Sequence, residues 1–379
     1  MQAQLANDIF KATTLIRITA VAWFFAKIMS WKLWLADRVF PVAAPLDFLN
    51  SAPSQVHLYL LILSLGGLFG VVLYPQNKIV AACLLVVELL SCSLDQLRWQ
   101  PWEYQYMLTL CFFLLYKSDK DFIKALSLLL VATYFFSGLF KINGGFLHNI
   151  WDNMMLRKLF GFKNEIIGNP IVHFSGLILP VIEIATALGL LFARQKKTFV
   201  WLALATHIFL LLAIGPSGLQ RNSIVWPWNF AMILLIFAVF YKEQNTILTL
   251  NFFKNKTNVA ISLIVAVLPL TNYIGLWPSY FSFKLYSGNS KILAIRVENT
   301  DRDPKLDKLI VNTNSIYCPA LKSINATKLS LDELNVPVYP EELYFKKLKS
   351  AWIQKFPETR SHFIIFQYPS KLENTKEIR

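Results

Sequence analysis

The feature that most constrains this chain is a series of apolar runs, each close to the length of a membrane crossing. A bilayer has about 30 Å of hydrocarbon, and about 17–25 helical residues cross it. Lipid offers the backbone no hydrogen-bond partners, so a run that crosses it is expected to be a helix. The sequence predicts nine crossings, with eight or ten as alternatives, at residues 12–29, 57–74, 79–97, 104–116, 122–141, 170–192, 199–215, 228–241 and 259–276.

Composition agrees with a lipid environment. Hydrophobic residues make up 55% of the chain and charged residues 16%, against about 45–50% and about 25% in soluble domains. The net charge is +14, but the basic residues stand singly or in short groups between apolar runs. That distribution is typical of membrane topology signals and argues against a nucleic-acid-binding face. The four cysteines form no CxxC motif, and no metal site is predicted.

The basic residues also predict how the chain is oriented in the membrane. They fall in short connections at one set of span ends, and such connections face the cytoplasm. The N-terminus is therefore expected in the cytoplasm, and with nine spans the C-terminal region outside. We expect the first helix to stay uncleaved, because the small residues 42–44 precede Pro45, a poor cleavage context. The basic residues that predict this orientation are Lys11, Lys78, Lys117, Lys120, Lys124, Arg194, Lys196, Lys197, Lys242, Lys254 and Lys256.

The chain changes character after the last apolar run. Residues 1–276 are predicted to form the helical bundle, and residues 277–379 a small outer domain with a modest core of its own. A helix is expected at 340–356, where Pro340 stands at the first helical position. Strands are expected at 291–297, 309–312 and 362–368. The predicted fold class is an all-α polytopic membrane bundle with a small C-terminal α+β extramembrane domain.

The stretch 131–146 carries the clearest candidate chemistry. On a helix, Tyr134, Ser137, Gly138 and Lys141 fall at i, i+3, i+4 and i+7, so they share one stripe. Lipid offers these polar groups no partner, and the stripe should face other helices or a wet cavity. Lys141 then has two interpretations: an amine that reaches the headgroups from a helix end, or an amine at the mouth of an intramembrane pocket.

Further polar residues lie on the predicted outer side of the bundle. We expect some of them to surround Lys141 at the outer mouth and to orient a substrate. Trp226, one of these residues, has the alternative interpretation of a member of the interfacial aromatic belt. The candidates are Asp95, Arg98, Glu103, Arg221, Trp226 and Asn229.

Three ionisable residues fall near the middle of predicted spans: Glu88, Glu183 and His207. A charge at the bilayer centre costs at least about 2.5–3.5 kcal/mol, so each must be paired, protonated or hydrated. Glu183 and His207 lie at similar depth on consecutive spans and are predicted to be partners. That pair is either a structural hydrogen bond between helices or a functional relay.

Several motifs together resemble one family. The segments LDQLRWQPWEYQY, YFFSGLFKINGGF, VWPWN and PSYFSFKLYSGN, with the helix that carries His207, are similar to the HTTM family, which is related to vitamin K-dependent gamma-carboxylase. The similarity covers about 270 residues. Its most specific part is YFxSGLxKIN, in which Lys141 takes the place of the family's catalytic lysine, while His207 matches a histidine of a later helix.

The resemblance implies an activity and a cofactor. In the carboxylase a lysine deprotonates a hydroquinone, which oxygen then oxidises, so Lys141 would be the base and a reduced quinone the cofactor. Lys141 can act as this base only if its surroundings desolvate the amine and so lower its pKa. The sequence departs from the carboxylase at residues 102–104, where the relatives have a histidine, and in the segment IFLLLAIG, which lacks expected polar residues.

Three classes of function follow. The first is an enzyme at the outer face that acts on a quinol or lipid, with Lys141 as base. The alternative is a non-catalytic membrane component that anchors or assists an exported protein or peptide. The third class is a pathway for protons or small molecules through Glu88, Glu183 and His207. It has the least support of the three, because the sequence has no inverted repeat and no pair of Gly/Pro-broken helices.

Overall fold

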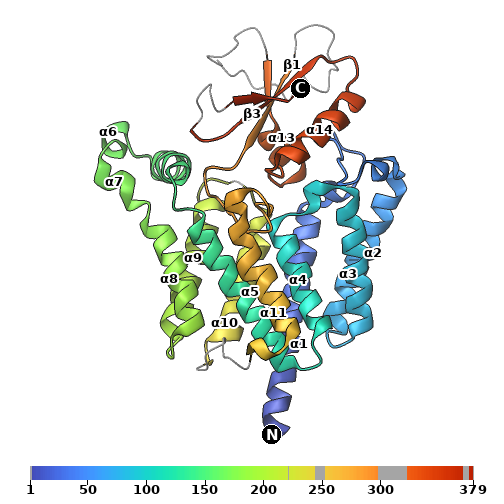
Figure 1. Ribbon diagram of the computed structural model, residues 1–379, viewed down its shortest axis with the longest axis vertical. Coiled ribbons are helices and arrows are strands. Elements are labelled where there is room, and N and C mark those ends of the chain that lie inside the picture. The colour runs from blue at the N-terminus through green and yellow to red at the C-terminus, as the bar shows by residue number, and fades with distance from the viewer. Residues whose placement is uncertain (1, 221, 244–251, 298–321, 370–374, 379) are drawn as a thin grey trace. The chain divides into compact units, whose positions relative to one another are not determined.

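The computed structural model describes residues 2–220, 222–243, 252–297, 322–369 and 375–378. Most of this part of the chain is helical, and residues near the C-terminus form an antiparallel sheet (Figure 1). The chain divides into two compact units. Unit 1 comprises residues 1–26, 63–86 and 101–288, and unit 2 comprises residues 27–62, 87–100 and 289–379.

The helical elements are long apolar helices and, between some of them, shorter helical segments. Up to residue 140 they are α1 (Gln2–Met29), η1 (Trp31–Trp34), η2 (Asp47–Ser51), α2 (Ser54–Leu73), α3 (Lys78–Leu94), η3 (Gln96–Arg98), α4 (Pro101–Leu115) and α5 (Asp119–Leu139). The next are η4 (Phe146–Leu159), α6 (Asn164–Ile167), α7 (Pro170–Ser175), α8 (Ile178–Phe192), α9 (Lys197–Ile214), α10 (Val225–Phe240), η5 (Phe252–Lys254), α11 (Lys256–Ser262), η6 (Leu263–Val267) and η7 (Leu268–Ile274).

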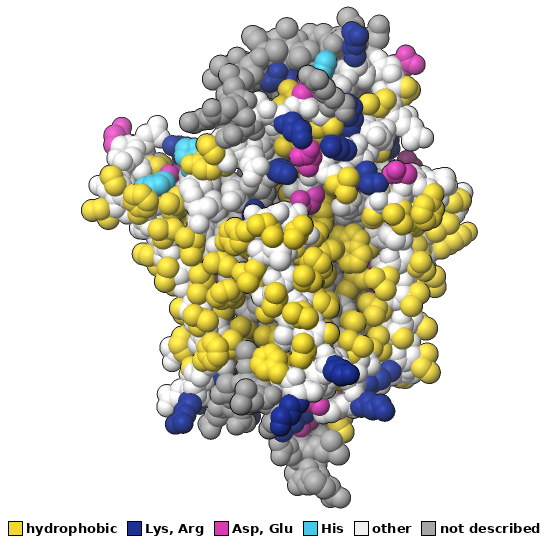
Figure 2. Space-filling model, viewed as in Figure 1, with side chains coloured by type: hydrophobic (Ala, Val, Ile, Leu, Met, Phe, Trp, Pro, Cys, Tyr) yellow, Lys and Arg dark blue, Asp and Glu magenta, His cyan; other side chains and the backbone are white. Residues whose placement is uncertain are grey.

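Six helical segments in the described residues are long and apolar enough to cross a membrane. They are Ala6–Met29, Ser54–Leu73, Asp119–Leu139, Pro170–Phe192, Lys197–Ile214 and Lys256–Ile274. Figure 2 shows hydrophobic side chains over much of the visible surface of the helices.

The predicted count of nine spans is not confirmed. The predicted third, fourth and eighth spans correspond to α3, α4 and α10, which have 17, 15 and 16 residues. At 1.5 Å per residue a 15-residue helix covers only about 23 Å, less than the hydrocarbon thickness of about 30 Å. The third predicted run also extends past α3, because its last residues, Gln96 and Leu97, belong to η3.

Helix α5 forms the core of unit 1. Its residues are almost all buried from Phe122 to Gly138, so both polar and apolar side chains of this helix face protein. A Cβ added at Gly138 would lie 2.8 Å from the Pro180 carbonyl oxygen and 3.0 Å from Cβ of Glu183. The absence of a side chain at this position therefore lets α5 approach α8 closely, as small residues do in membrane helices.

Unit 2 contains the sheet, in which the strand order is β2-β1-β3-β4 and neighbouring strands are antiparallel. The strands are β1 (Ile292–Val297), β2 (Lys322–Asn325), β3 (Ser361–Phe366) and β4 (Thr375–Glu377), and the helices α13 (Ala326–Leu334) and α14 (Glu342–Lys355). Leu293 and Ile295 alternate with less buried residues on β1, as do Phe363 and Ile365 on β3, and Trp352 of α14 lies against Phe363. One face of the sheet thus holds the core.

The secondary structure predicted after residue 276 is correct for two strands and one helix. Residues 291–297 contain β1, residues 362–368 overlap β3, and residues 340–356 contain α14. The predicted strand 309–312 lies outside the described residues. The prediction missed β2, α13 and β4.

Candidate functional site

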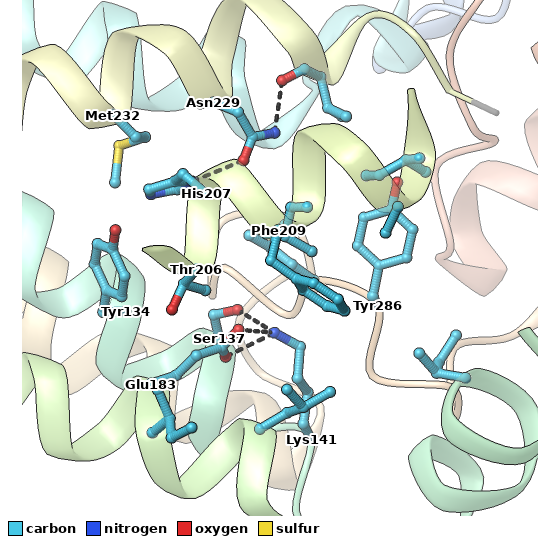
Figure 3. A pocket seen from close by; sticks show the side chains of 18 of the residues that line it. Tyr134, Ser137, Lys141, Glu183, Thr206, His207, Phe209, Asn229, Met232 and Tyr286 are labelled. Atoms are coloured by element: carbon cyan, nitrogen blue, oxygen red, sulfur yellow. Dashed lines mark hydrogen bonds and ion pairs between the residues drawn. The ribbon is translucent and has the colours of Figure 1, made fainter. Parts of the chain in front are cut away.

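Unit 1 contains a partly open cavity of about 300 Å³. Its wall is formed by side chains of α5, η4, α8, α9 and α10, together with Leu285 and Tyr286 of the segment between η7 and β1 (Figure 3). Most of the lining is apolar. The polar lining residues are Thr133, Tyr134, Ser137, Lys141, Glu183, Thr206, His207, Asn229 and Tyr286.

An ion pair between α5 and α8 occupies one wall of the cavity. The Nζ of Lys141 donates to Oε1 and Oε2 of Glu183 at 2.5 and 2.6 Å and to Oγ of Ser137 at 2.8 Å (Figure 3). Each of the two charged side chains is only 10% exposed. The interpretation of Lys141 as an amine that reaches the headgroups is therefore wrong, because protein atoms bind all three of its protons.

The local fold explains why this pair forms. Lys141 follows the end of α5, and its backbone N–H still donates to the Gly138 carbonyl at 3.0 Å, which keeps the side chain on the α5 stripe. The side chain of Asn143 then joins two elements: its amide donates to the Phe140 carbonyl at 2.8 Å, and its oxygen accepts from the N–H of Phe146 in η4 at 3.0 Å. This bridge fixes the turn in which Lys141 lies.

His207 on α9 is hydrogen-bonded to Asn229 on α10. Its Nδ1 lies 2.7 Å from Oδ1 of Asn229, and Nδ2 of Asn229 donates to the Val225 carbonyl at 2.7 Å (Figure 3). The predicted pairing of Glu183 with His207 is wrong, because Glu183 bonds to Lys141. The prediction assumed that consecutive helices supply the partners, whereas Gly138 brings α8 against α5.

Tyr134 and His207 lie next to each other on the cavity wall. Their ring centroids are 5.5 Å apart, with the rings at 79°. Tyr134 Oη and His207 Nε2 are buried, and neither has a hydrogen-bond partner among the described residues. Figure 3 shows the Tyr134 hydroxyl on the side of His207 and Met232, away from the Lys141–Glu183 pair.

Asp95 and Arg98, predicted to surround Lys141, belong to unit 2 and do not line the cavity. Asp95 pairs with Arg38 and caps η3 by accepting from the Leu97 N–H at 3.1 Å. Arg98 donates to the carbonyls of Leu33 and Ser91, and its Nη2 lies 2.7 Å from Nδ1 of His57. Burial lowers the pKa of Arg98 to about 10, so it stays charged at neutral pH. These groups form a structural network.

Two further predicted residues are also bound elsewhere. Glu88 pairs with Lys27 in unit 2, where the Lys27 ammonium lies 3.2 Å from the centroid of the Trp34 ring. Glu103 accepts a hydrogen bond of 2.6 Å from Trp23 Nε1 in unit 1. Neither Glu88 nor Glu103 lines the cavity. Of the three states expected for Glu88, namely paired, protonated or hydrated, the structure shows the paired one.

The remaining predicted residues divide into two groups. Tyr134, Ser137, His207 and Asn229 line the same cavity as Lys141, whereas Trp226 is half-buried and does not line it. Arg221 lies outside the described residues. The part of the chain that the structure describes contains no group of three or more His, Cys, Asp or Glu residues that could hold a metal ion.

Sequence reasoning missed several residues of this site. It did not assign Glu183 to Lys141, although a glycine one turn before the lysine is a signal for close helix contact. Trp228 and Met232 of α10 and Tyr286 also line the cavity, and no sequence signal distinguishes them from other apolar or aromatic residues.

Comparison with known proteins gives no relative from which to assign this site. No protein-family model matches the sequence, and no curated protein or solved structure is detectably similar to it.

Proposed function

We propose that this chain is a membrane enzyme that binds a lipid-soluble molecule in the cavity of unit 1 and removes a proton from it, with Lys141 as the base. The observation that carries the proposal is the Lys141–Glu183 ion pair, which lies in the wall of a largely apolar cavity. Cavities that bind small molecules have this character, with an apolar lining and a few converging polar groups.

The energetics of the pair support a functional role. Removing two charges from water costs several kcal/mol per ion, and apolar residues of similar volume often stabilise a protein as well or better. Charges within membrane segments are accordingly functional candidates, and their partners are part of the site. Here the partner is identified, and both charged groups line the cavity.

The pair also balances a proton transfer. Lys141 Nζ is bonded to both Glu183 oxygens, so a proton can pass from the ammonium to the carboxylate and leave a neutral amine. The amine then takes the proton of a substrate O–H group. The O–H bond breaks and leaves its electron pair on the oxygen, and a new N–H bond forms. The oxyanion lies against the new ammonium, and Glu183 holds the displaced proton, so no net charge enters the cavity.

The surface around the cavity supports a substrate that arrives from lipid. On α9, Trp201, Ile208 and Leu212 are each at least 50% exposed, as expected for a lipid-facing stripe. Ala205 belongs to this exposed stripe and also lines the cavity. The cavity therefore borders the side of α9 that would face hydrocarbon.

The HTTM resemblance makes the proposal more specific. It suggests a reduced quinone as the molecule that Lys141 deprotonates, with His207 as a second residue that contacts it. The proposal includes a multi-pass arrangement in a cell membrane, with the N-terminus in the cytoplasm and residues 277–379 outside. The non-catalytic alternative, a component that assists an exported protein or peptide, stays a prediction.

The test is the oxidation of a naphthohydroquinone by the full chain in lipid nanodiscs, followed as oxygen consumption. We expect wild-type protein to consume oxygen and both Lys141→Ala and Lys141→Arg to be inactive, because guanidinium cannot act as a base near neutral pH. The control is Lys163→Ala, at an exposed lysine of the same region. Full activity of Lys141→Arg would contradict the base, and no activity in wild-type protein that binds the hydroquinone would favour the non-catalytic alternative.

A further inference from the structure

The cavity holds a second pair of polar groups, separate from the ion pair. Tyr134 on α5 and His207 on α9 present Oη and Nε2, both buried and without a partner among the described residues. Leaving a buried polar group unsatisfied costs about 1–3 kcal/mol. Two such atoms on one cavity wall therefore point to a ligand group that satisfies both.

The hydrogen bonds behind His207 determine what that group is. The Val225 carbonyl can only accept, so the Asn229 atom that faces it at 2.7 Å must be the amide NH₂. The Asn229 oxygen consequently faces His207 Nδ1, and since that oxygen can only accept, Nδ1 must carry the proton. In the neutral ring, which an apolar cavity favours, Nε2 then holds a lone pair and acts as an acceptor.

Tyr134 supplies the complementary group. Its hydroxyl can donate one hydrogen bond, and its ring lies edge to face with that of His207. A hydroxyl group that sits between them can donate to His207 Nε2 and accept from Tyr134 Oη. A carbonyl could accept from Tyr134 but would leave Nε2 without a donor, and a hydrocarbon would leave both atoms unsatisfied.

We infer that Tyr134 and His207 form a subsite for the hydroxyl group of an apolar alcohol or phenol, with Asn229 as the positioning residue that fixes the imidazole. This inference rests on the proposed occupancy of the cavity by a lipid-soluble molecule. It adds a specificity requirement: the ligand carries a hydroxyl group at this wall, in addition to any group that Lys141 deprotonates.

Two probes of similar shape test the subsite, naphthalene and 2-naphthol. Their binding to the full chain in nanodiscs is measured by equilibrium dialysis, and uptake by empty nanodiscs is subtracted. We expect wild-type protein to prefer 2-naphthol on the order of ten-fold, as two hydrogen bonds between neutral groups predict. Tyr134→Phe and His207→Asn each remove one of the two hydrogen bonds, so each should reduce the preference about three-fold. The amide of the introduced asparagine keeps a donor near the position of Nδ1 but has no acceptor at the position of Nε2.

Two further variants sharpen the result. His207→Gln places an amide oxygen near the position of Nε2 and should retain more of the preference than His207→Asn. Thr206→Val is the control, because the Thr206 hydroxyl also lines the cavity but donates to the Leu202 carbonyl of its own helix at 2.9 Å. Its preference should equal that of wild-type protein. Unchanged naphthalene binding in each variant shows that the cavity is intact.

The outcomes separate this inference from the proposed function. If wild-type protein binds naphthalene but shows no preference for 2-naphthol, or if Tyr134→Phe and His207→Asn retain it in full, the subsite is wrong and the proposed function stands. If wild-type protein binds neither probe, occupancy of the cavity is contradicted and both proposals fail.

Discussion

Lys141 Nζ faces both carboxylate oxygens of Glu183, at 2.5 Å from one and 2.6 Å from the other, although the two residues are 42 positions apart in the sequence. The pair joins α5 to α8 in the wall of the cavity. Its geometry depends on the packing of those two helices, and its chemistry depends on where the shared protons lie. Both dependences can be measured.

The first prediction concerns helix packing. Gly138→Ala would place a methyl group 2.8 Å from the Pro180 carbonyl oxygen, so α5 and α8 must move apart. Overpacking of this kind costs about 1–3 kcal/mol, and the shift should weaken the Lys141–Glu183 pair. The measurement is the thermal unfolding temperature of the protein in mild detergent. Gly66→Ala is the matched control, because a Cβ at Gly66 has nothing within 4 Å, and it should leave the temperature unchanged or raise it. Equal effects of the two substitutions would contradict the close approach at Gly138.

The second prediction separates the stability of the pair from its function. Glu183→Leu leaves the Lys141 ammonium buried without its partner and should lower the free energy of unfolding by about 3–5 kcal/mol. The double variant Lys141→Met with Glu183→Leu removes both charges and should recover most of that loss. The free energies are measured by denaturant titration in detergent, with the exposed Lys163→Met as control.

The double variant should nevertheless be inactive with the naphthohydroquinone. Stability and activity would then respond in opposite ways to the removal of the second charge. If the double variant is less stable than Glu183→Leu alone, the two charges do not form the energetic unit described here.

The third prediction concerns unit 2. Both carboxylate oxygens of Glu333 on α13 accept hydrogen bonds from backbone N–H groups, from Val39 at 2.5 Å and from Phe40 at 2.6 Å. Glu333→Ala should therefore speed hydrogen exchange of these two amides by at least about ten-fold, since bonds to charged acceptors contribute about 1.5–3 kcal/mol. The readout is hydrogen–deuterium exchange with mass spectrometry. Asp332→Ala, at the exposed neighbouring residue, should not change the rate, and a similar acceleration there would contradict the anchoring role of Glu333.

The fourth prediction is the orientation of the chain. The distribution of basic residues predicts that the N-terminus lies in the cytoplasm and residues 277–379 on the other side of the membrane. A reporter that is active only in the cytoplasm should be silent when it is fused after Arg379 and active when it is fused before Met1. Strong activity of the C-terminal fusion would contradict the predicted orientation.

The sequence predicts helices well where the apolar pattern is long. The runs 122–141 and 199–215 correspond closely to α5 and α9. It overestimates the third span, because the predicted run 79–97 continues into Gln96 and Leu97, which belong to η3 and not to α3. Helix α13 was missed because its residues are mostly polar. Its ends carry a local signal, since Asn325 caps the first turn and Asn335 closes the helix in the left-handed conformation at φ 58°.

The candidate site is only partly predictable for a physical reason. The spacing of Tyr134, Ser137 and Lys141 is a local property of one helix, and these three residues do line one cavity. The partner of Lys141 depends on which helix packs against α5, and periodicity does not determine that. The sequence grouped Asp95 and Arg98 with Lys141 by predicted depth alone. In the structure both are buried in unit 2, where Asp95 pairs with Arg38, and Arg98 contacts Ser91 and His57.

The central claim, that Lys141 removes a substrate proton while Glu183 receives the displaced one, is tested most directly by infrared difference spectroscopy. Naphthohydroquinone is added to the full chain in nanodiscs without oxygen, so that deprotonation is the only step. Wild-type protein should develop the absorption of a protonated carboxyl group, and this band should be missing in Glu183→Gln and Lys141→Arg. A wild-type spectrum with no protonated carboxyl band, or a band that persists in Glu183→Gln, would contradict the account.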